Sequence, residues 1–243
     1  MAMIVLFTDF GLEGPYVGQI KAVLDRETPG ATVIDLFHDA PVHEPEFAGY
    51  LLAAYAAAFP DDAVFLCAVD PGVGSERVAV AVRADGRWYV GPDNGLFAIV
   101  ARRARSSEWW DIAAPEGAVS ATFHGRDVFA PVAARLARGE GPPGARRAEA
   151  TQSDWPDDLA RVIYIDRFGN AITGLRAAAL GDGHAIEVGG RVLARARTFS
   201  DVEPGEAFWY QNSNGLAAIA VNRGRADEAL GLGIGAPVTV RGA

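Results

Sequence analysis

Cysteine is nearly absent from the 243-residue sequence, in which Cys67 is the single example. One cysteine excludes an internal disulfide framework and any zinc site that is built from several thiolates. Cys67 lies within the apolar run VFLCAV, where a cysteine is most simply a small core residue. The sequence therefore predicts a fold that is held together by its hydrophobic core.

Positive charge and long apolar runs are scarce as well. The 22 Lys and Arg residues face 31 Asp and Glu residues, and the formal net charge is −9. This balance argues against nucleic acid or an anionic membrane as the main partner. No stretch approaches the roughly 18 to 20 apolar residues of a membrane span. The first residues, MAMIVLFTDF, lack the basic start of a signal peptide, so we expect a cytoplasmic protein.

Apolar strands alternate with amphipathic helices in the first part of the sequence. Continuous apolar strands that are separated by helices are typical of a parallel sheet covered on both faces. A hairpin with Asp85-Gly86 at its tip is also expected. We predict an α/β domain with a mainly parallel sheet over residues 1–140. Its predicted strands are 3–8, 31–37 and 63–69, and its predicted helices are 16–30, 45–60, 94–105 and 124–139.

The composition changes after residue 140. Residues 141–160 are rich in Gly, Pro and charge without periodicity, which indicates a linker. Beyond it, short apolar stretches are separated by turns that contain Gly and Asn, a pattern typical of antiparallel strands. We predict a smaller antiparallel, β-barrel-like domain over residues 161–243.

Two acids, Asp9 and Asp70, directly follow predicted strands of the first domain. Ligands bind at the carboxyl ends of parallel strands, where a carboxylate can bind ribose hydroxyls or act as a base. Either acid could equally cap the next turn or helix. Asp70 begins the turn DPGVG (residues 70–74, here the DPGVG turn), and Arg77 follows it. No Lys-Ser/Thr pair follows these glycines, and the next residues have a strand pattern, so a phosphate loop is not predicted.

His124, in TFHGRDVF, precedes a predicted helix. The positive end of a helix favours a neutral imidazole, which can accept a proton or a hydrogen bond. A helix cap or a buried histidine would fit the same segment. His38 and His43 share a Pro-containing loop without an evident third ligand, so no metal site is predicted. Asp93 and Asn94 of the PDNG turn are interpreted mainly as caps.

Six segments, taken in order, make this sequence similar to a known family. They are TDFG…YVGQIKAVL, AVDPGVGSER, GPDNGLF, TFHGRDVFAPVAARL, DRFGNAITGL and NSNGLAAIAVNRG. Together they resemble the S-adenosyl-L-methionine hydroxide adenosyltransferases, or SAM hydrolases, which are relatives of the enzymes that make 5′-halo-adenosines. The resemblance covers nearly the whole chain. It implies attack of water or hydroxide on the ribose C5′ of S-adenosyl-L-methionine, which gives adenosine and L-methionine without a metal or organic cofactor. It also implies a homotrimer with its active sites at subunit interfaces.

The resemblance implies roles for individual residues. Asp70, Arg77 and His124 match the set that is proposed to hold and activate the water. Asp9 matches the acid that binds the ribose 2′- and 3′-hydroxyls, and Asp166 is expected near the methionine ammonium. The other residues expected to bind substrate, mainly around the adenine, are Tyr16, Phe168, Asn170, Phe199, Ser213, Asn222 and Arg223.

Two other interpretations of the sequence stay open. One is a relative that forms a 5′-halo-adenosine or cleaves another nucleoside, and the other is a non-catalytic protein that binds an adenosyl ligand. The halogenating relatives carry an aromatic residue where Asp70 stands, which favours water as the nucleophile. Many family members also carry an acid directly before the PY of the first loop, whereas this chain has Gly14 there and Glu13 one position earlier. Whether Glu13 replaces that acid stays open.

Overall fold

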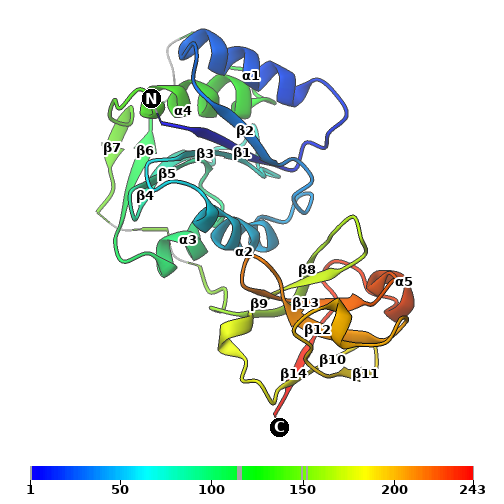
Figure 1. The fold of residues 1–243 in the computed structure, drawn as a ribbon. Coiled ribbons are helices and arrows are strands. Elements are labelled where there is room, and N and C mark those ends of the chain that lie inside the picture. The colour runs from blue at the N-terminus through cyan, green and yellow to red at the C-terminus, as the bar shows by residue number, and fades with distance from the viewer. Residues whose placement is uncertain (1, 114–116, 149, 152, 243) are drawn as a thin grey trace. The chain divides into compact units, whose positions relative to one another are not determined.

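The chain divides into two compact units, Met1–Ser153 and Asp154–Ala243 (Figure 1). The computed structural model describes residues 2–113, 117–148, 150–151 and 153–242. Each unit is considered separately below. None of the described helices has the length and apolar character needed to cross a membrane.

A mixed sheet of seven strands forms the centre of the first unit among the described residues (Figure 1). Strands β2, β1, β3 and β5 pair in parallel, whereas β4, β6 and β7 join by antiparallel pairing. The expectation of a mainly parallel sheet is therefore corrected to a mixed sheet with a parallel half. In spatial order the strands are β2 (Val33–Phe37), β1 (Ile4–Thr8), β3 (Val64–Ala68), β5 (Arg87–Pro92), β4 (Ala79–Ala84), β6 (Ser107–Ile112) and β7 (Gly144–Arg146).

The antiparallel half has a local cause. Ala84 pairs with Arg87 across the two-residue turn Asp85-Gly86, so β5 returns beside β4 as the predicted hairpin requires. Strand β6, which was not predicted, then pairs with the other edge of β4. Strand β7 lies inside the segment 141–160 that was expected as a linker, and it pairs with β6. The first sheet thus extends beyond residue 140.

Helices cover both faces of this sheet. Helices α1 (Tyr16–Glu27) and α4 (Ala130–Ala137) lie on one face, and α2 (Pro45–Tyr55) and α3 (Ala98–Arg103) lie on the other (Figure 1). Strands β1 and β3 are buried along their whole length, which explains why both consist of continuous apolar residues. Burial of these strands between two helical layers supplies the main hydrophobic driving force for the unit.

The predicted helix 124–139 is divided into two parts. Residues Gly125–Phe129 form a π-helical turn, in which the N–H of Ala130 bonds to the carbonyl of Gly125, and α4 follows. Pro131 has no N–H and cannot donate the bond that an α-helix would direct to the carbonyl of Asp127. The wider turn therefore precedes the proline, and such turns are frequent at functional sites.

The described part of the second unit contains two antiparallel sheets, a short α-helix, α5 (Ala226–Leu230), and two 3₁₀ turns. Its core contains Trp209, Ile219 and Ile186, all of which are fully buried. The predicted antiparallel architecture is confirmed, but within the described part of this unit the two sheets do not close into a barrel. The sheets are β12 (Ala207–Gln211), β13 (Leu216–Val221), β9 (Ala171–Arg176) and β8 (Leu159–Ile165), and β11 (Arg191–Leu193), β10 (Ala185–Val188) and β14 (Thr239–Arg241).

The hairpin turn gives a test of the fold. Gly86 has φ +96°, and a Cβ on it would lie 2.7 Å from the carbonyl oxygen of Asp61. We expect Gly86→Ala to lower the free energy of unfolding of the first unit by about 2–3 kcal/mol, because backbone strain and a steric clash add. The control Gly30→Ala has φ +79° with open space around it, and its expected loss is about 1 kcal/mol. Denaturant titration measures both losses, and equal values would contradict the role of the Asp61 contact.

Candidate functional site

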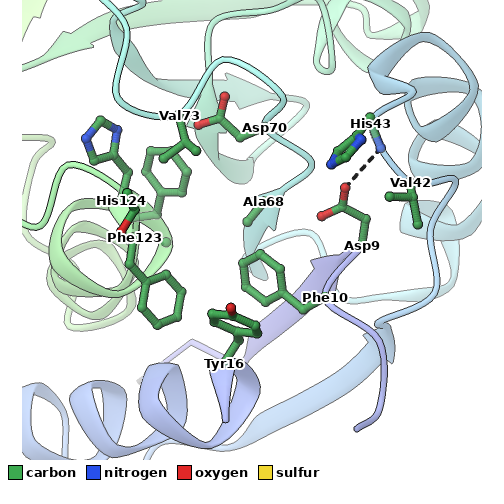
Figure 2. A pocket seen from close by; sticks show the side chains of 13 residues that line it. Asp9, Phe10, Tyr16, Val42, His43, Ala68, Asp70, Val73, Phe123 and His124 are labelled. Atoms are coloured by element: carbon green, nitrogen blue, oxygen red, sulfur yellow. Dashed lines mark hydrogen bonds between the residues drawn. The ribbon is translucent and has the colours of Figure 1, made fainter. Parts of the chain in front are cut away.

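A pocket of the first unit lies where the loops after β1, β2 and β3 meet the segment before the π-helical turn (Figure 2). Its volume is about 340 Å³. It stands at the carboxyl ends of parallel strands, where ligands bind in sheets of this kind. The lining residues are Asp9, Phe10, Tyr16, Val42, His43, Ala68, Asp70, Val73, Thr122, Phe123, His124, Gly125 and Phe129.

The structure thus brings together four residues that the sequence analysis selected from distant segments, namely Asp9, Tyr16, Asp70 and His124. In the view of Figure 2, His124 stands at the left of the pocket, Asp9 stands at the right, and Asp70 stands at the top between them. His124 is the residue directly before the π-helical turn, at its N-terminal end. Arg77, which was predicted to act with Asp70 and His124, is not among the lining residues. It contacts Asp70, which is one of them.

Asp70 is held by a two-pronged ion pair with Arg77. The Nε of Arg77 donates to Oδ1 of Asp70 at 2.9 Å, and its Nη2 donates to Oδ2. The side chains of Arg77 and Asp70 are only 11% and 9% exposed. Two parallel charge-assisted hydrogen bonds fix the plane of the carboxylate. Each oxygen keeps a further lone pair, so Asp70 can still accept a hydrogen bond from a molecule in the pocket.

The DPGVG turn is fixed from within and from outside. The hydroxyl of Ser75 donates to the carbonyl of Gly72 at 2.7 Å and accepts the N–H of Arg77 at 3.2 Å. Gly74 has φ +83°, and a Cβ on it would lie 2.7 Å from the carbonyl oxygen of Ala121. Glycine therefore permits close contact between this turn and the segment that leads to His124.

Asn94 of the PDNG turn connects to the same strand end. Its Nδ2 donates to the carbonyl of Val69 at 2.9 Å, and its Oδ1 accepts the N–H of Leu96 at 3.3 Å. The second bond forms a local turn instead of the expected helix cap, because α3 begins at Ala98 with Phe97 as its N-cap and without a side-chain cap bond. The first bond fixes the residue directly before Asp70. Asp93 serves another purpose, because its carboxylate contacts Arg147 at 2.7 Å.

The carboxylate of Asp9 is held differently from that of Asp70. Its Oδ2 accepts the backbone N–H of His43 at 3.2 Å, which Figure 2 marks. Burial raises the pKa of the Asp9 carboxyl above its ordinary value, and the nearby charge of Asp70 adds to the rise, although His43 opposes it. His43 has φ +61° and lines the pocket. The sequence analysis considered it only as a metal ligand; its place after β2, at the carboxyl edge of the sheet, was the available signal.

Aromatic rings form an apolar wall of the pocket. The ring centroids of Phe10 and Tyr16 are 5.6 Å apart, and the ring of Phe123 lies 5.9 Å from Phe10 and 5.3 Å from Tyr16. Arg126 lies over Phe123 at 5.2 Å and donates to Asp127 at 2.6 Å from its Nε. The Arg-Asp pair of HGRD therefore holds the segment around His124 and leaves the wall apolar.

A second pocket, of about 710 Å³, lies within the second unit. Five residues that were expected to bind substrate line it. They come from the DRFGN turn, from the 3₁₀ turn Phe199–Asp201 and from the segment after β13. The lining residues are Asp166, Phe168, Asn170, Phe199, Tyr210, Val221, Arg223, Gly224 and Arg225. Tyr210 and Arg225 were not selected from the sequence, since a strand tyrosine and a turn arginine carry no distinctive signal.

The carboxylate of Asp166 organises the DRFGN turn. Its Oδ1 accepts the backbone N–H groups of Phe168 and Asn170, each at 2.9 Å, and its Oδ2 accepts the side-chain amide of Asn170 at 2.8 Å. These bonds leave the ring of Phe168 76% exposed. Contact of Asp166 with a ligand ammonium stays a prediction, and it would have to use the remaining lone pairs.

Two expected residues are not brought into the second pocket. Ser213 is exposed in the turn between β12 and β13 and is absent from the lining. Asn222 donates its side-chain amide to the carbonyl of Val202 at 2.8 Å, which fixes a neighbouring loop. Turn composition identified both residues but could not indicate which way each side chain points.

The raised pKa of Asp9 predicts a stability effect. Because its folded-state pKa lies above the unfolded value, ionised Asp9 costs the fold free energy at neutral pH, and this cost disappears as the pH falls through the folded-state pKa. Asp9→Asn keeps an oxygen for the N–H of His43. We expect it to raise the melting temperature of the first unit by about 1–3 °C at pH 7, and by less as the pH approaches about 4.

The control for Asp9→Asn is Asp127→Asn, for which the opposite sign is expected. Hydrogen bonds from Arg126 hold the pKa of Asp127 below its usual range, so removal of its charge lowers the melting temperature at pH 7. Calorimetric scans between pH 4 and 7 compare both variants with the parent protein. A lower melting temperature for Asp9→Asn at pH 7 would contradict the desolvation of this carboxylate.

Comparison with known proteins agrees with the two-unit fold. Residues 4–145 match the SAM hydroxide adenosyltransferase N-terminal domain, and residues 160–239 match the C-terminal domain. The chain is 45% identical to the (R)-S-adenosyl-L-methionine hydrolase of Thermus thermophilus, over 98% of this chain and 99% of that protein. A fluorinase of Nocardia brasiliensis is more distant, at 26% identity over 90% of each chain. The crystal structure of a conserved protein from Thermotoga maritima matches with a TM-score of 0.90 and 32% identity, over 98% of this chain and all of that one.

Proposed function

The chain belongs to the SAM hydroxide adenosyltransferase family, and we propose that it is an enzyme that hydrolyses S-adenosyl-L-methionine to adenosine and L-methionine. The observation that carries this proposal is the buried Asp70–Arg77 pair beside a pocket that also contains Asp9 and His124. The family resemblance assigns these four residues to the water and the ribose. The pocket chemistry supports that assignment, as follows.

The reaction is a displacement at carbon. The oxygen of water attacks C5′ of the ribose, the C5′–S bond breaks, and its electron pair stays on the sulfur, which leaves as the neutral thioether of L-methionine. One proton of the water is released. A carboxylate is a far weaker base than hydroxide, so Asp70 does not generate free hydroxide beforehand. Asp70 orients the water and accepts its proton late in the displacement.

Arg77 and His124 support this step in different ways. The two bonds from Arg77 fix the carboxylate plane of Asp70, so that a free lone pair has one direction toward the pocket. His124 shares the pocket lining with Asp70 and can hold the second side of the water through a ring nitrogen. A water that is held by two groups loses less entropy in the transition state than a free one.

Asp9 and the aromatic wall bind and activate the substrate. Each oxygen of the Asp9 carboxylate can accept a hydrogen bond from one ribose hydroxyl, and this binding offsets the desolvation that raises its pKa. The wall formed by Phe10, Tyr16 and Phe123 excludes water from the reacting centre. Since the sulfonium loses its charge as the thioether departs, an apolar wall disfavours the charged ground state more than the transition state.

The second pocket is proposed to bind the adenine and the methionine moiety. The rings of Phe199 and Tyr210 have centroids 5.3 Å apart and offer faces on which a purine can stack. The exposed ring of Phe168 is a further stacking surface in the same pocket. Asp166 supplies negative charge for the methionine ammonium.

We propose that a first pocket of one copy and a second pocket of another copy form each active site, in a homotrimer. Exposed apolar side chains gather in the loops around the first pocket, and exposed apolar patches of this kind mark interaction surfaces. Leu12, in the loop after β1, is 84% exposed, and Val42, in the loop after β2, is 60% exposed. Val73 and Val78, in and after the DPGVG turn, are 38% and 45% exposed. Burial of these side chains against another copy would exclude water from the pocket.

Product identification tests the reaction. We expect the wild-type protein to convert S-adenosyl-L-methionine into equal amounts of adenosine and L-methionine, resolved by chromatography. Asp70→Asn keeps the shape of the side chain but removes the base, so turnover should fall by about 100-fold or more. Its affinity for adenosine, measured by calorimetry, should change by less than about threefold, because Asp70 faces the water rather than the nucleoside.

The matched control is Asp158→Asn. Asp158 also forms a two-pronged pair, with Arg176, whose Nε donates at 2.8 Å, but it lines neither of the two pockets described above. Its turnover should stay within about twofold of wild type. Unchanged turnover of Asp70→Asn would remove this residue from the mechanism. If a 5′-halo-adenosine formed in the presence of chloride or fluoride, the function would be halide transfer and not hydrolysis.

Mixed assemblies test the shared site. Phe168→Lys removes the ring on which the purine is proposed to stack, and the exposure of Phe168 should leave folding intact. Co-expression of Asp70→Asn and Phe168→Lys chains in equal amounts should restore roughly a quarter of wild-type turnover, since half of each kind of pocket is intact. Each variant alone serves as the control, and light scattering measures the number of copies. Mixed assemblies that are no more active than the separate variants would contradict a site formed by two copies.

A further inference from the structure

Two buried polar side chains, Thr8 and His38, lie outside the lining of the first pocket. His38 is 3% exposed and Thr8 is completely buried. The Oγ1 of Thr8 lies 2.8 Å from Nδ1 of His38, and Nε2 of His38 lies 3.1 Å from Oδ1 of Asp35. The hydroxyl of Thr8 and the ring of His38 thus share a hydrogen bond, and the other ring nitrogen of His38 lies close to the Asp35 carboxylate.

This hydroxyl also binds the loop that contains Asp9. The N–H of Phe10 donates to Oγ1 of Thr8 at 3.4 Å. One hydroxyl oxygen therefore contacts both the loop after β1 and His38, the residue that follows β2. Asp35 is itself anchored, since the Nζ of Lys21 lies 2.5 Å from its Oδ2.

Backbone bonds run alongside these side-chain contacts. The N–H of Gly11 donates to the carbonyl of His38 at 2.6 Å, and the N–H of Ala40 donates to the carbonyl of Thr8 at 3.1 Å. The loops that follow β1 and β2 are therefore joined on both sides of Asp9. The loop after β2 then supplies the N–H of His43 that Asp9 accepts at 3.2 Å.

We propose that Thr8 and His38 are positioning residues for Asp9: they fix the loop after β1 relative to the loop after β2, and so set where the Asp9 carboxylate meets the ribose hydroxyls. This inference rests on the proposed function. Neither side chain is among the lining residues, so each acts through the backbone of Asp9 and Phe10. A carboxylate that binds two hydroxyls must be placed to within about 0.5 Å, which hydrogen bonds between the two loops provide.

The test compares two buried threonines. Thr8→Val keeps the shape of the side chain but leaves the N–H of Phe10 and Nδ1 of His38 without this partner. We expect the KM for S-adenosyl-L-methionine and the Kd for adenosine to rise about tenfold, with kcat changed by less than about threefold. The control is Thr173→Val in β9, since Thr173 is also fully buried and donates to the carbonyl of Ala217 at 2.7 Å. Its KM and Kd should stay within about twofold of wild type.

Three further variants separate positioning from a general loss of stability. Thr8→Ser keeps the hydroxyl and should restore both constants to within about twofold of wild type. His38→Phe keeps a planar ring without the ring nitrogens and should raise both constants as Thr8→Val does. If Thr8 acts through Asp9, Thr8→Val should add less than about twofold to the Kd for adenosine of Asp9→Asn. All measurements are made below the melting temperature of every variant.

The outcomes distinguish the two proposals. Adenosine release by the wild type together with an unchanged KM and Kd for Thr8→Val would overturn the positioning role. If Thr8→Val raised the Kd for adenosine of Asp9→Asn by the same factor as it raises that of the wild type, the positioning role would be overturned as well. A wild-type protein that releases no adenosine from S-adenosyl-L-methionine overturns the proposed function instead. The adenosine affinities of Thr8→Val and Thr173→Val then still decide the positioning role.

Discussion

The parallel pairing of β1 with β3 is the constraint on which the site depends. Their register pairs Thr8 with Ala68, so Asp9 and Asp70 emerge at the same edge of a buried sheet. Two carboxylates placed together at an apolar edge repel each other and lose hydration. The fold resolves this by treating them differently. Asp70 receives a guanidinium, whereas Asp9 receives one backbone N–H and keeps a raised pKa, which leaves it ready for hydroxyl donors.

The loops around these acids are fixed by bonds between one loop and another. Asn94 holds the strand end before Asp70, and the absence of a side chain at Gly74 lets the DPGVG turn approach Ala121. Thr8 and His38 join the other two loops. A displacement of any one loop is therefore resisted by its neighbours, as preorganised recognition of a small substrate requires.

Local rules in the sequence account for much of this architecture. Continuous apolar runs identified β1, β2 and β3, and the Asp85-Gly86 pair identified the hairpin, because burial and turn geometry depend on a few adjacent residues. Strand β6 was missed, since its sequence SEWWDI lacks alternation and its position is set by pairing with the distant β4. The acids and His124 were found from motifs at strand and helix ends. The orientation of Ser213 and Asn222, and the inclusion of His43, Tyr210 and Arg225, depend on three-dimensional packing that no local pattern records.

The π-helical turn before α4 has a consequence for the independence of site and core. A bond that spans five residues contains one residue more than an α-helical bond, and one residue corresponds to a rotation of about 100° around the helix axis. The direction in which His124 projects from the helix axis is therefore rotated relative to that of the α4 residues Val132 and Leu136. These two residues pack in the core. In an uninterrupted α-helix, the same face would have to line the pocket and pack against the core. The inserted residue lets the histidine face the pocket while the helix keeps its apolar stripe on the sheet, so that core and pocket can vary in sequence separately.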